Sequence, residues 1–176
     1  MTFNFVLSVL MAINVCLPLN DTNPSEIASL SLTEWYVGQG SYKCYEDYKC
    51  ITDTSSPQWR LQQEAYTDEN GLRKVDDLYC VALGSHYGTK IGTEYIIELD
   101  TGAQFKVILA DQKADCDTDV ENIADGNGAV IEFVVDTPYL DSTARKMGDI
   151  SYINGFGGKV RKIYEQRTSG RYSVSP

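Results

Sequence analysis

The sequence predicts an all-β fold, a small β-barrel built from short strands with one short helix. Runs rich in apolar, β-branched and aromatic residues recur between residues 78 and 164, and glycine or aspartate turn signals separate them. Within this region a helical pattern occurs only at residues 139–147, so strands do not alternate with long helices. Short strands at this spacing favour a barrel over an α/β sheet.

The individual elements follow from local patterns taken in chain order. Residues 59–67 have the pattern of one or two helical turns ahead of a turn signal. The predicted strands are residues 78–83, 95–99, 104–110, 129–135 and 159–164. The second and third of these flank a short turn and therefore predict a hairpin. The helix predicted at residues 139–147 ends at Gly148.

The N-terminus predicts a leader ahead of the folded domain. Residues 1–20 carry no charged side chain, and the apolar run 3–19 has the length of a signal-peptide core. No basic residue precedes this run and no clean small-x-small site follows it, so a buried N-terminal strand or helix is the alternative. The predicted organisation is a leader (1–20), a linker (21–34), an aromatic cysteine-containing extension (35–75), a barrel domain (76–168) and a tail (169–176).

Charge and motifs exclude several classes of function. The 176-residue chain has a formal net charge of −10, which argues against a nucleic-acid partner because phosphate binding needs a basic face. Residues 111–125 are acidic and residues 145–171 are basic, which a solvated loop facing a basic strand explains. A basic groove for an anionic polymer is the alternative. Patterns for nucleotide binding, serine hydrolysis and zinc proteolysis do not occur.

The cysteines indicate disulfides in an oxidising compartment. Removal of the leader would take away Cys16 and leave Cys44, Cys50, Cys80 and Cys116, an even number with three possible pairings. We favour Cys44 with Cys50, which would close a local loop, and Cys80 with Cys116, which would tie a strand to an acidic loop. Structural zinc is disfavoured because the chain has no CxxC pair and a single histidine.

Two further segments allow a structural and a functional interpretation. The aromatic stretch that begins at Trp35 and Tyr36 predicts a disulfide-pinned flap over one end of the core, or a surface that stacks on sugar rings. The alternating carboxylates at residues 115–121 lack the glycine and terminal glutamate of an EF-hand. Loose calcium binding with Asp125 and Asn127 is the alternative to a solvated loop.

Two carboxylates stand where core packing alone does not require them. Asp111 ends one apolar strand, and Glu132 lies inside another. Apolar surroundings raise the proton affinity of a carboxyl group, which suits a general acid near neutral pH. Glycan cleavage uses such groups in pairs, or as one acid that switches to base. The structural alternatives are an aspartate that binds turn amides and a glutamate on the solvent face of its strand.

Four segments carry a family resemblance: Tyr87-Gly88-Thr89 before a strand, Leu109-Ala110-Asp111 at a strand end, Ile131-Glu132-Phe133 within a strand, and Gly148-Asp149-Ile150 with Lys159-Val160 at the close. In this order they resemble the double-psi β-barrel families of rare lipoprotein A, the expansins and the three-aspartate lytic transglycosylases. The likeness covers about half of the chain. It departs from the family where Gln112 replaces the start of Arg-Gly-Pro and where Glu132 replaces an aspartate. Residues 79–152 also look like accessory domains of clostridial-type or phage cell-wall proteins.

The resemblance implies a six-stranded double-psi β-barrel with one short helix and a disulfide-pinned N-terminal extension. It implies a secreted or cell-surface protein that cleaves peptidoglycan, in which Asp111 protonates the glycosidic oxygen and Glu132 positions or charge-balances Asp111. Candidate substrate contacts are Tyr87, Trp35, Tyr36 and Lys113. No cofactor, no metal, no nucleic acid and no stable membrane insertion beyond the leader are expected. The alternatives are a non-catalytic carbohydrate- or wall-binding module and a phage or surface structural protein.

Overall fold

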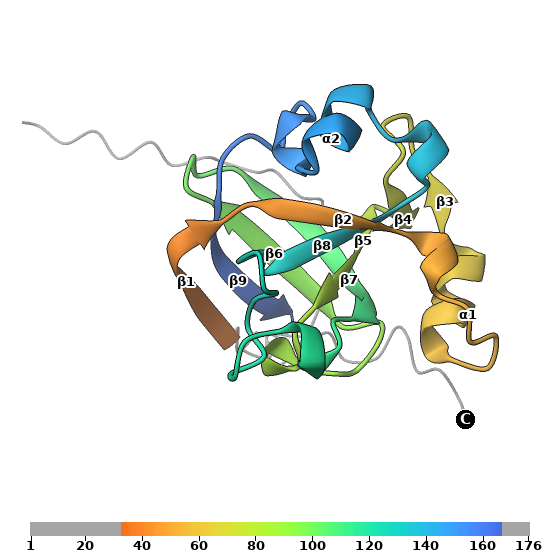
Figure 1. Cartoon of the computed structure of the whole chain (residues 1–176), viewed down its shortest axis with the longest axis horizontal. Coiled ribbons are helices and arrows are strands. Elements are labelled where there is room, and N and C mark those ends of the chain that lie inside the picture. Colours follow the sequence, from red (N-terminus) through yellow and green to blue (C-terminus); the bar gives the residue numbers. More distant parts are fainter. Residues whose placement is uncertain (1–32, 167–176) are drawn as a thin grey trace, which may run out of the picture.

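A computed structural model describes residues 33–166, in which nine strands form a single mixed β-sheet with two α-helices at its margins (Figure 1). The strands are β1 (Thr33–Ser41), β2 (Lys43–Asp47), β3 (Tyr66–Thr67), β4 (Arg73–Val75), β5 (Leu78–Leu83), β6 (Glu94–Leu99), β7 (Gln104–Gln112), β8 (Ile131–Val135) and β9 (Val160–Gln166). The helices are α1 (Pro57–Glu64) and α2 (Ser142–Met147).

The sheet has the order β1-β9-β6-β7-β5-β4-β3, and a branch runs from β5 through β8 to β2. Most neighbours are antiparallel, but β5 is parallel to β7 and β2 is parallel to β8. The antiparallel β6–β7 pair is the hairpin that the sequence predicts. Strand β5 is the centre of the fold because its first residues pair with β4 and its last residues pair with β8.

The core lies against β5, β8 and the middle of β7 (Val107–Ala110), whose side chains are almost all buried. Strand β6 alternates half-buried and buried residues, as a strand with one face on the core does. Four aromatic rings meet edge to face at one end of this core, which adds to the stability gained from burying their area. They belong to Tyr79, Phe105, Phe133 and Phe156.

Both helices begin at residues that local chemistry favours, and α2 also ends at one. Ser56 accepts a hydrogen bond from the backbone N–H of Trp59 at the start of α1, and Pro57 occupies the first turn. Asp141 caps α2, and Gly148 ends it in the left-handed conformation with φ of 68°. The predicted helical segments at 59–67 and 139–147 are therefore confirmed with shifted boundaries, as are the five predicted strands.

The predicted closed barrel is wrong: the sheet is open. No hydrogen-bonded ladder between described residues closes it, because β5 shares its length between β4 and β8 and sends the sheet in two directions. Strands β1 and β2 are consecutive in the chain, separated by Tyr42, yet they pair with β9 and β8 respectively. The expected N-terminal flap is thus part of the sheet itself, and α1 forms where one or two helical turns were expected beside the barrel's single helix.

The predicted disulfides are also absent, since Cys44, Cys50, Cys80 and Cys116 are all free thiols. Cys44 and Cys50 are held apart by the extended end of β2, over which three residues span roughly 10 Å. Cys80 is fully buried inside β5, whereas Cys116 is exposed on the loop beyond β7. Burial raises the pKa of the Cys80 thiol to about 12, so this side chain is a packing residue.

Some predictions concern residues outside the described part of the chain. The leader at 1–20, the linker up to residue 32 and the tail at 169–176 all lie there. Among residues 33–166, no helix combines the length and the apolar character needed to cross a membrane.

Candidate functional site

Three adjacent strands bring Asp111 and Glu132 to the two sides of one small residue. Ala82 of β5 is opposite Glu132 in the ladder with β8 and opposite Asp111 in the ladder with β7. The two acids therefore lie two strands apart, with their backbones separated by roughly 10 Å. Ala82 is buried and lines a pocket, so its methyl group leaves room for longer side chains on either side.

A β-bulge in β7 determines where Asp111 lies. The register passes from Val81 opposite Leu109 to Ala82 opposite Asp111, so Ala110 is an extra residue without its own partner. In a regular ladder Ala110 would stand opposite Ala82, and Asp111 would lie one step further along. The bulge therefore moves the carboxylate into the row that contains Glu132. Bulges are common next to active sites because they re-aim a side chain in this way.

A third carboxyl group joins this row from β2. Cys44 is opposite Glu132 in the parallel β2–β8 ladder, and Glu46 lies two residues further along on the same face of its strand. The Glu46 carboxyl hydrogen-bonds the Asp111 carboxyl, and its Oε1 atom is buried with no hydrogen-bond partner. Burial, followed by the nearby charges of Asp111 and Glu132, raises the pKa of Glu46 to about 8.

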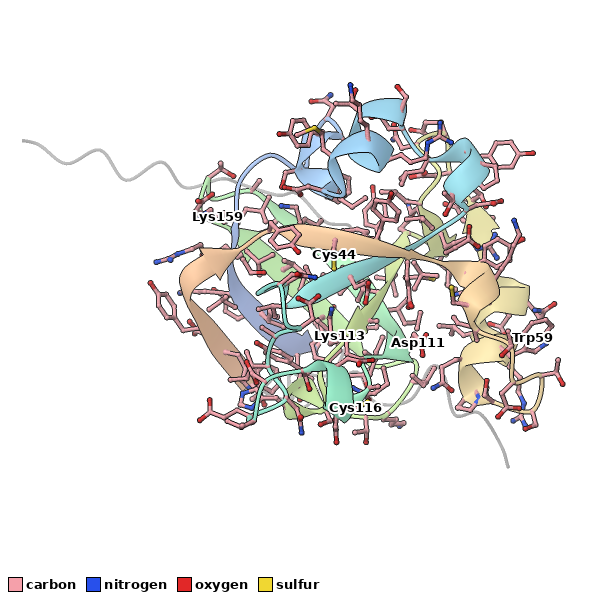
Figure 2. All side chains as sticks on the ribbon, in the orientation of Figure 1. Cys44, Trp59, Asp111, Lys113, Cys116 and Lys159 are labelled. Atoms are coloured by element: carbon pink, nitrogen blue, oxygen red, sulfur yellow. The ribbon has the colours of Figure 1, made fainter. Side chains whose placement is uncertain are left out.

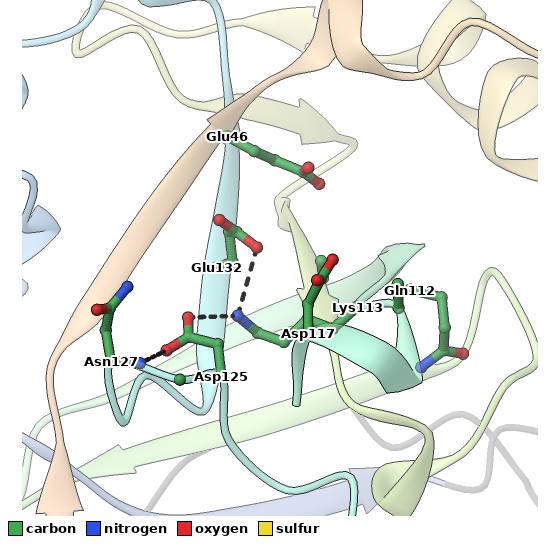
Figure 3. Close-up of a pocket in the computed structure, with 10 residues that line it drawn as sticks. Glu46, Gln112, Lys113, Asp117, Asp125, Asn127 and Glu132 are labelled. Atoms are coloured by element: carbon green, nitrogen blue, oxygen red, sulfur yellow. Dashed lines mark hydrogen bonds and ion pairs between the residues drawn. The ribbon is translucent and has the colours of Figure 1, made fainter. Parts of the chain in front are cut away.

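Lys113 provides the positive charge of the site. Its side chain is 3% exposed, and its Nζ lies 3.1 Å from Asp125 Oδ2 and 3.3 Å from Glu132 Oε2. Burial alone would lower the pKa of this lysine, but Cys44, Glu132 and Asp125 around it raise the value. Lys113 therefore keeps its proton and holds the two carboxylates in place. Figure 3 shows its Nζ between them, with Glu46 on the neighbouring strand.

The loop that leaves β7 carries several residues of the site and is fixed to the end of β5. Asn122 packs its carbonyl oxygen against Gly84, where an added Cβ would come within 1.9 Å of it. Ser85 Oγ donates a hydrogen bond of 2.8 Å to Asp115 Oδ1. The Asp119 carboxylate accepts three backbone N–H bonds from within the loop, which lower its pKa and rigidify the turn.

Asp125 closes this loop back onto the sheet. Its Oδ1 accepts the backbone N–H of Asn127 and of Ala129, while its Oδ2 binds Lys113. Burial pushes the pKa of Asp125 upward, but the Ala129 N–H and the Lys113 ammonium hold it below its ordinary value. Asp125 is thus an ionised side chain that positions Lys113.

These elements enclose a pocket of about 430 Å³. Its polar lining has four acidic side chains and one basic side chain, together with two amides. The lining residues are Glu46, Ala82, Gln112, Lys113, Ala114, Asp117, Asp125, Gly126, Asn127 and Glu132. The volume lies in the range of small-molecule sites, and the balance of charge disfavours an anionic ligand.

The arrangement is suited to moving a proton. Two carboxyl groups in hydrogen-bond contact need one proton between them, since two carboxylates only accept. Glu46 is the group that retains this proton at neutral pH, and Asp111 accepts the hydrogen bond. Glu132 is paired with Lys113 on the other side of Ala82. A carboxyl group with a raised pKa, Glu46, and a carboxyl group paired with a lysine, Glu132, therefore line one pocket, and acid–base catalysis uses pairs of acids whose surroundings differ in this way.

The structure brings together three of the predicted site residues, Asp111, Glu132 and Lys113. Figure 2 shows Asp111 and Lys113 close together where β7 ends, with Cys116 further out on the loop. The other three lie elsewhere. Tyr87 is buried, and Trp35 packs edge-on against it with ring centroids 5.5 Å apart. Tyr36 is 62% exposed and lines a different pocket, with Arg161 stacked on its ring.

Glu46 is the residue that sequence reasoning missed. It lies in the tyrosine-rich stretch that was interpreted as a flap, and a flap gives no reason to expect a buried acid. Residues 43–47 do not alternate between polar and apolar side chains, so the period-2 signal of a half-buried strand is absent from this segment. Its pairing with β8, nearly ninety residues further on, leaves no local signal.

Within residues 33–166, no three His, Cys, Asp or Glu side chains converge in a way that could hold a metal ion. The oxygens of Asp125 that a loosely bound calcium would use are occupied by backbone N–H groups and by Lys113.

Comparison of the chain with protein-family models, curated proteins and solved structures finds no match.

Proposed function

We propose that this protein is an acid–base enzyme that cleaves glycosidic bonds in an extracytoplasmic polysaccharide, with peptidoglycan as the first substrate to test. The observation that carries the proposal is the buried contact between the carboxyl groups of Glu46 and Asp111 at the pocket that Glu132 lines. A carboxyl group that remains protonated at neutral pH beside an ionised one is the arrangement that glycoside cleavage requires.

In the proposed reaction, Glu46 gives its proton to the glycosidic oxygen as the C1–O bond breaks. Asp111 helps to hold this proton on Glu46 before the reaction and stabilises the pair afterwards. Glu132, held by Lys113, stabilises the positive charge that develops on the sugar ring. Water, or a hydroxyl of the same sugar, then attacks C1, and its proton returns to the Glu46–Asp111 pair. The proton donor thus differs from the sequence-based expectation, in which Asp111 held the proton.

The pocket also supports a restriction on the substrate. Glu46, Asp117, Asp125 and Glu132 line it with a single lysine, which already binds two of them. A neutral or positively charged sugar unit suits this lining, whereas a uronic acid or a phosphorylated sugar would be repelled. The uncharged N-acetylated sugars of a peptidoglycan strand meet this requirement. A secreted or cell-surface location, indicated by the apolar run 3–19, accompanies the proposal.

Digestion of purified peptidoglycan, with mass analysis of the soluble fragments, tests this function. The unmodified protein should release sugar fragments, and Glu46→Gln and Asp111→Asn should each lower the rate by about a hundredfold or more. Glu121→Gln alters an exposed acid on the loop that carries Lys113 and Asp125, and it should leave the rate unchanged. Absence of released fragments, or full activity of Glu46→Gln, would reject the proposal.

The binding-module alternative has its own supporting observation. Tyr36, Tyr139 and Tyr152 are 62%, 70% and 52% exposed, and exposed tyrosine rings can stack on sugar faces. A non-catalytic module would sediment with insoluble wall material, lose this binding on Tyr→Ala substitution, and release no fragments. Wall binding that survives Glu46→Gln but is lost in Tyr36→Ala would favour this alternative.

A further inference from the structure

Lys43, a buried lysine on the other face of β2, takes no part in the proposed glycan cleavage. Lys43 is adjacent to Cys44, so its side chain points away from the pocket that Glu46 lines. It is 0% exposed, and its Nζ lies 2.8 Å from Ser151 Oγ and 2.6 Å from the carbonyl oxygen of Gly158. Among the described residues, no carboxylate lies within ion-pair distance of this nitrogen.

Its surroundings favour the neutral amine. Desolvation lowers the pKa of Lys43 to about 8, and the more distant carboxylates of Asp149 and Asp100 offset only part of this effect. Both of these acids are engaged elsewhere. Asp149 accepts the backbone N–H of Ser151 at 2.8 Å, and Asp100 accepts that of Lys159 at 2.9 Å. Much of the Lys43 population is therefore unprotonated at mildly alkaline pH.

We propose that Lys43 and Ser151 form a serine–lysine dyad in which Ser151 is a nucleophile towards carboxylic esters. The geometry is that of an activated serine, because the hydroxyl and its base are within hydrogen-bond distance and the base is desolvated. The Ser151 hydroxyl also lies 3.3 Å from the Gly158 carbonyl oxygen, so the base has to take the serine proton in place of that weaker acceptor contact. Ser151 is partly exposed, whereas its base is not.

The reaction balances with water as the only other reactant. Ser151 Oγ attacks the ester carbonyl carbon, and its proton passes to Lys43 Nζ. The C–O bond to the alcohol then breaks, and the departing alkoxide takes that proton from the ammonium group. Water hydrolyses the acyl-serine by the same route, releasing the carboxylic acid and restoring the hydroxyl group. No step uses the pocket residues, so failure of this proposal would not affect the proposed glycan cleavage.

Labelling with diisopropyl fluorophosphate tests the dyad. Ser151 Oγ would attack phosphorus, fluoride would leave, and the serine proton would pass to Lys43. We expect one adduct by intact-protein mass, mapped to Ser151 by peptide analysis, with a rate that rises between pH 7 and pH 9. Ser151→Ala should abolish the adduct. No adduct at pH 9, or an adduct elsewhere at a comparable rate, would overturn the proposal.

Lys43→Arg separates catalysis from structural pinning. Arginine keeps a charged donor for the Ser151 hydroxyl and the Gly158 carbonyl, but it cannot lose its proton to act as a base. We expect Lys43→Arg to keep the thermal unfolding profile and to be labelled about a hundredfold more slowly than the unmodified chain. If arginine does not fit this buried site, Lys43→Met gives the same comparison, provided that its circular dichroism spectrum matches that of the unmodified protein. Labelling at the unmodified rate in a folded Lys43 variant would show that the lysine only pins the loop.

Discussion

The contact between Gly84 and Asn122 gives the sharpest prediction about how the site is held. An alanine Cβ at position 84 would lie 1.9 Å from the Asn122 carbonyl oxygen and 2.8 Å from its carbon. Ordinary contact begins near 3.4 Å, so the loop carrying Lys113 and Asp125 must retreat by about 1.5 Å. Overpacking of this kind costs about 1–3 kcal/mol.

The backbone at this position sets the opposing term. Gly84 has φ of −66° and ψ of 157°, which alanine adopts without strain. Alanine also restricts the unfolded chain, which stabilises the fold by about 0.4–1 kcal/mol. The net expectation for Gly84→Ala is a loss of about 1–2 kcal/mol. Gly157→Ala is the matched control, because a Cβ there meets nothing within 4 Å and the φ angle is not in the left-handed region.

Urea unfolding monitored by tryptophan fluorescence measures the difference. Gly84→Ala should lower the unfolding midpoint, and thermal unfolding should move downward by about 2–8 °C. Gly157→Ala should stay within about 0.5 kcal/mol of the unmodified protein. Equal stability of the two variants would refute the claim that the loop is docked rigidly on Gly84.

The other predictions concern Glu46 of the acid pair, Lys113 of the pocket and a second glycine, Gly71. As pH rises from about 4.5 to about 8, the unfolded chain loses the Glu46 proton while the folded chain keeps it. The free energy of unfolding should therefore fall by up to about 1.4 kcal/mol per pH unit in this window. Urea titrations across the window should show this fall in the unmodified protein and lack it in Glu46→Gln. Lys113→Met leaves two partly exposed carboxylates without their cation and should destabilise the protein by about 1–3 kcal/mol, checked by calorimetry at pH 7. Gly71→Ala should lower the free energy of unfolding by about 2–4 kcal/mol, because φ is +84° and the new Cβ would lie 2.3 Å from the Leu140 nitrogen. Gly102→Ala is the control: φ is +82° but the new Cβ enters open space, so only the backbone strain of about 1 kcal/mol should appear.

Local signals in the sequence predict the elements of this fold well. The strand at 78–83 matches β5, and the hairpin of β6 and β7 follows from its alternation and turn. Gly148 stops α2 as expected, because only a residue tolerant of the left-handed conformation ends a helix in that way. Each of these depends on residues close together in the chain.

Features that depend on distant pairing were not predictable from local pattern. Strand β2 joins β8 across most of the domain, and the branch at β5 that keeps the sheet open depends on which of two partners each half selects. Even cysteine count gave the wrong result, since an even number does not bring two sulfur atoms within bonding distance. The sequence indicated Asp111 and Glu132 as candidates because acids in apolar strands are unusual, whereas Glu46 lies in a segment with no apolar run.

The titration of Glu46 is the most direct test of the claim that this buried carboxyl group holds a proton at neutral pH. Carbon-13 NMR of the side-chain carboxyl groups, assigned by comparison with Glu46→Gln, reports the pH at which this group ionises. We expect a midpoint near 8, which should fall in Asp111→Asn yet remain above the ordinary glutamate value because burial persists. A Glu46 midpoint near 4.5 in the unmodified protein would contradict it.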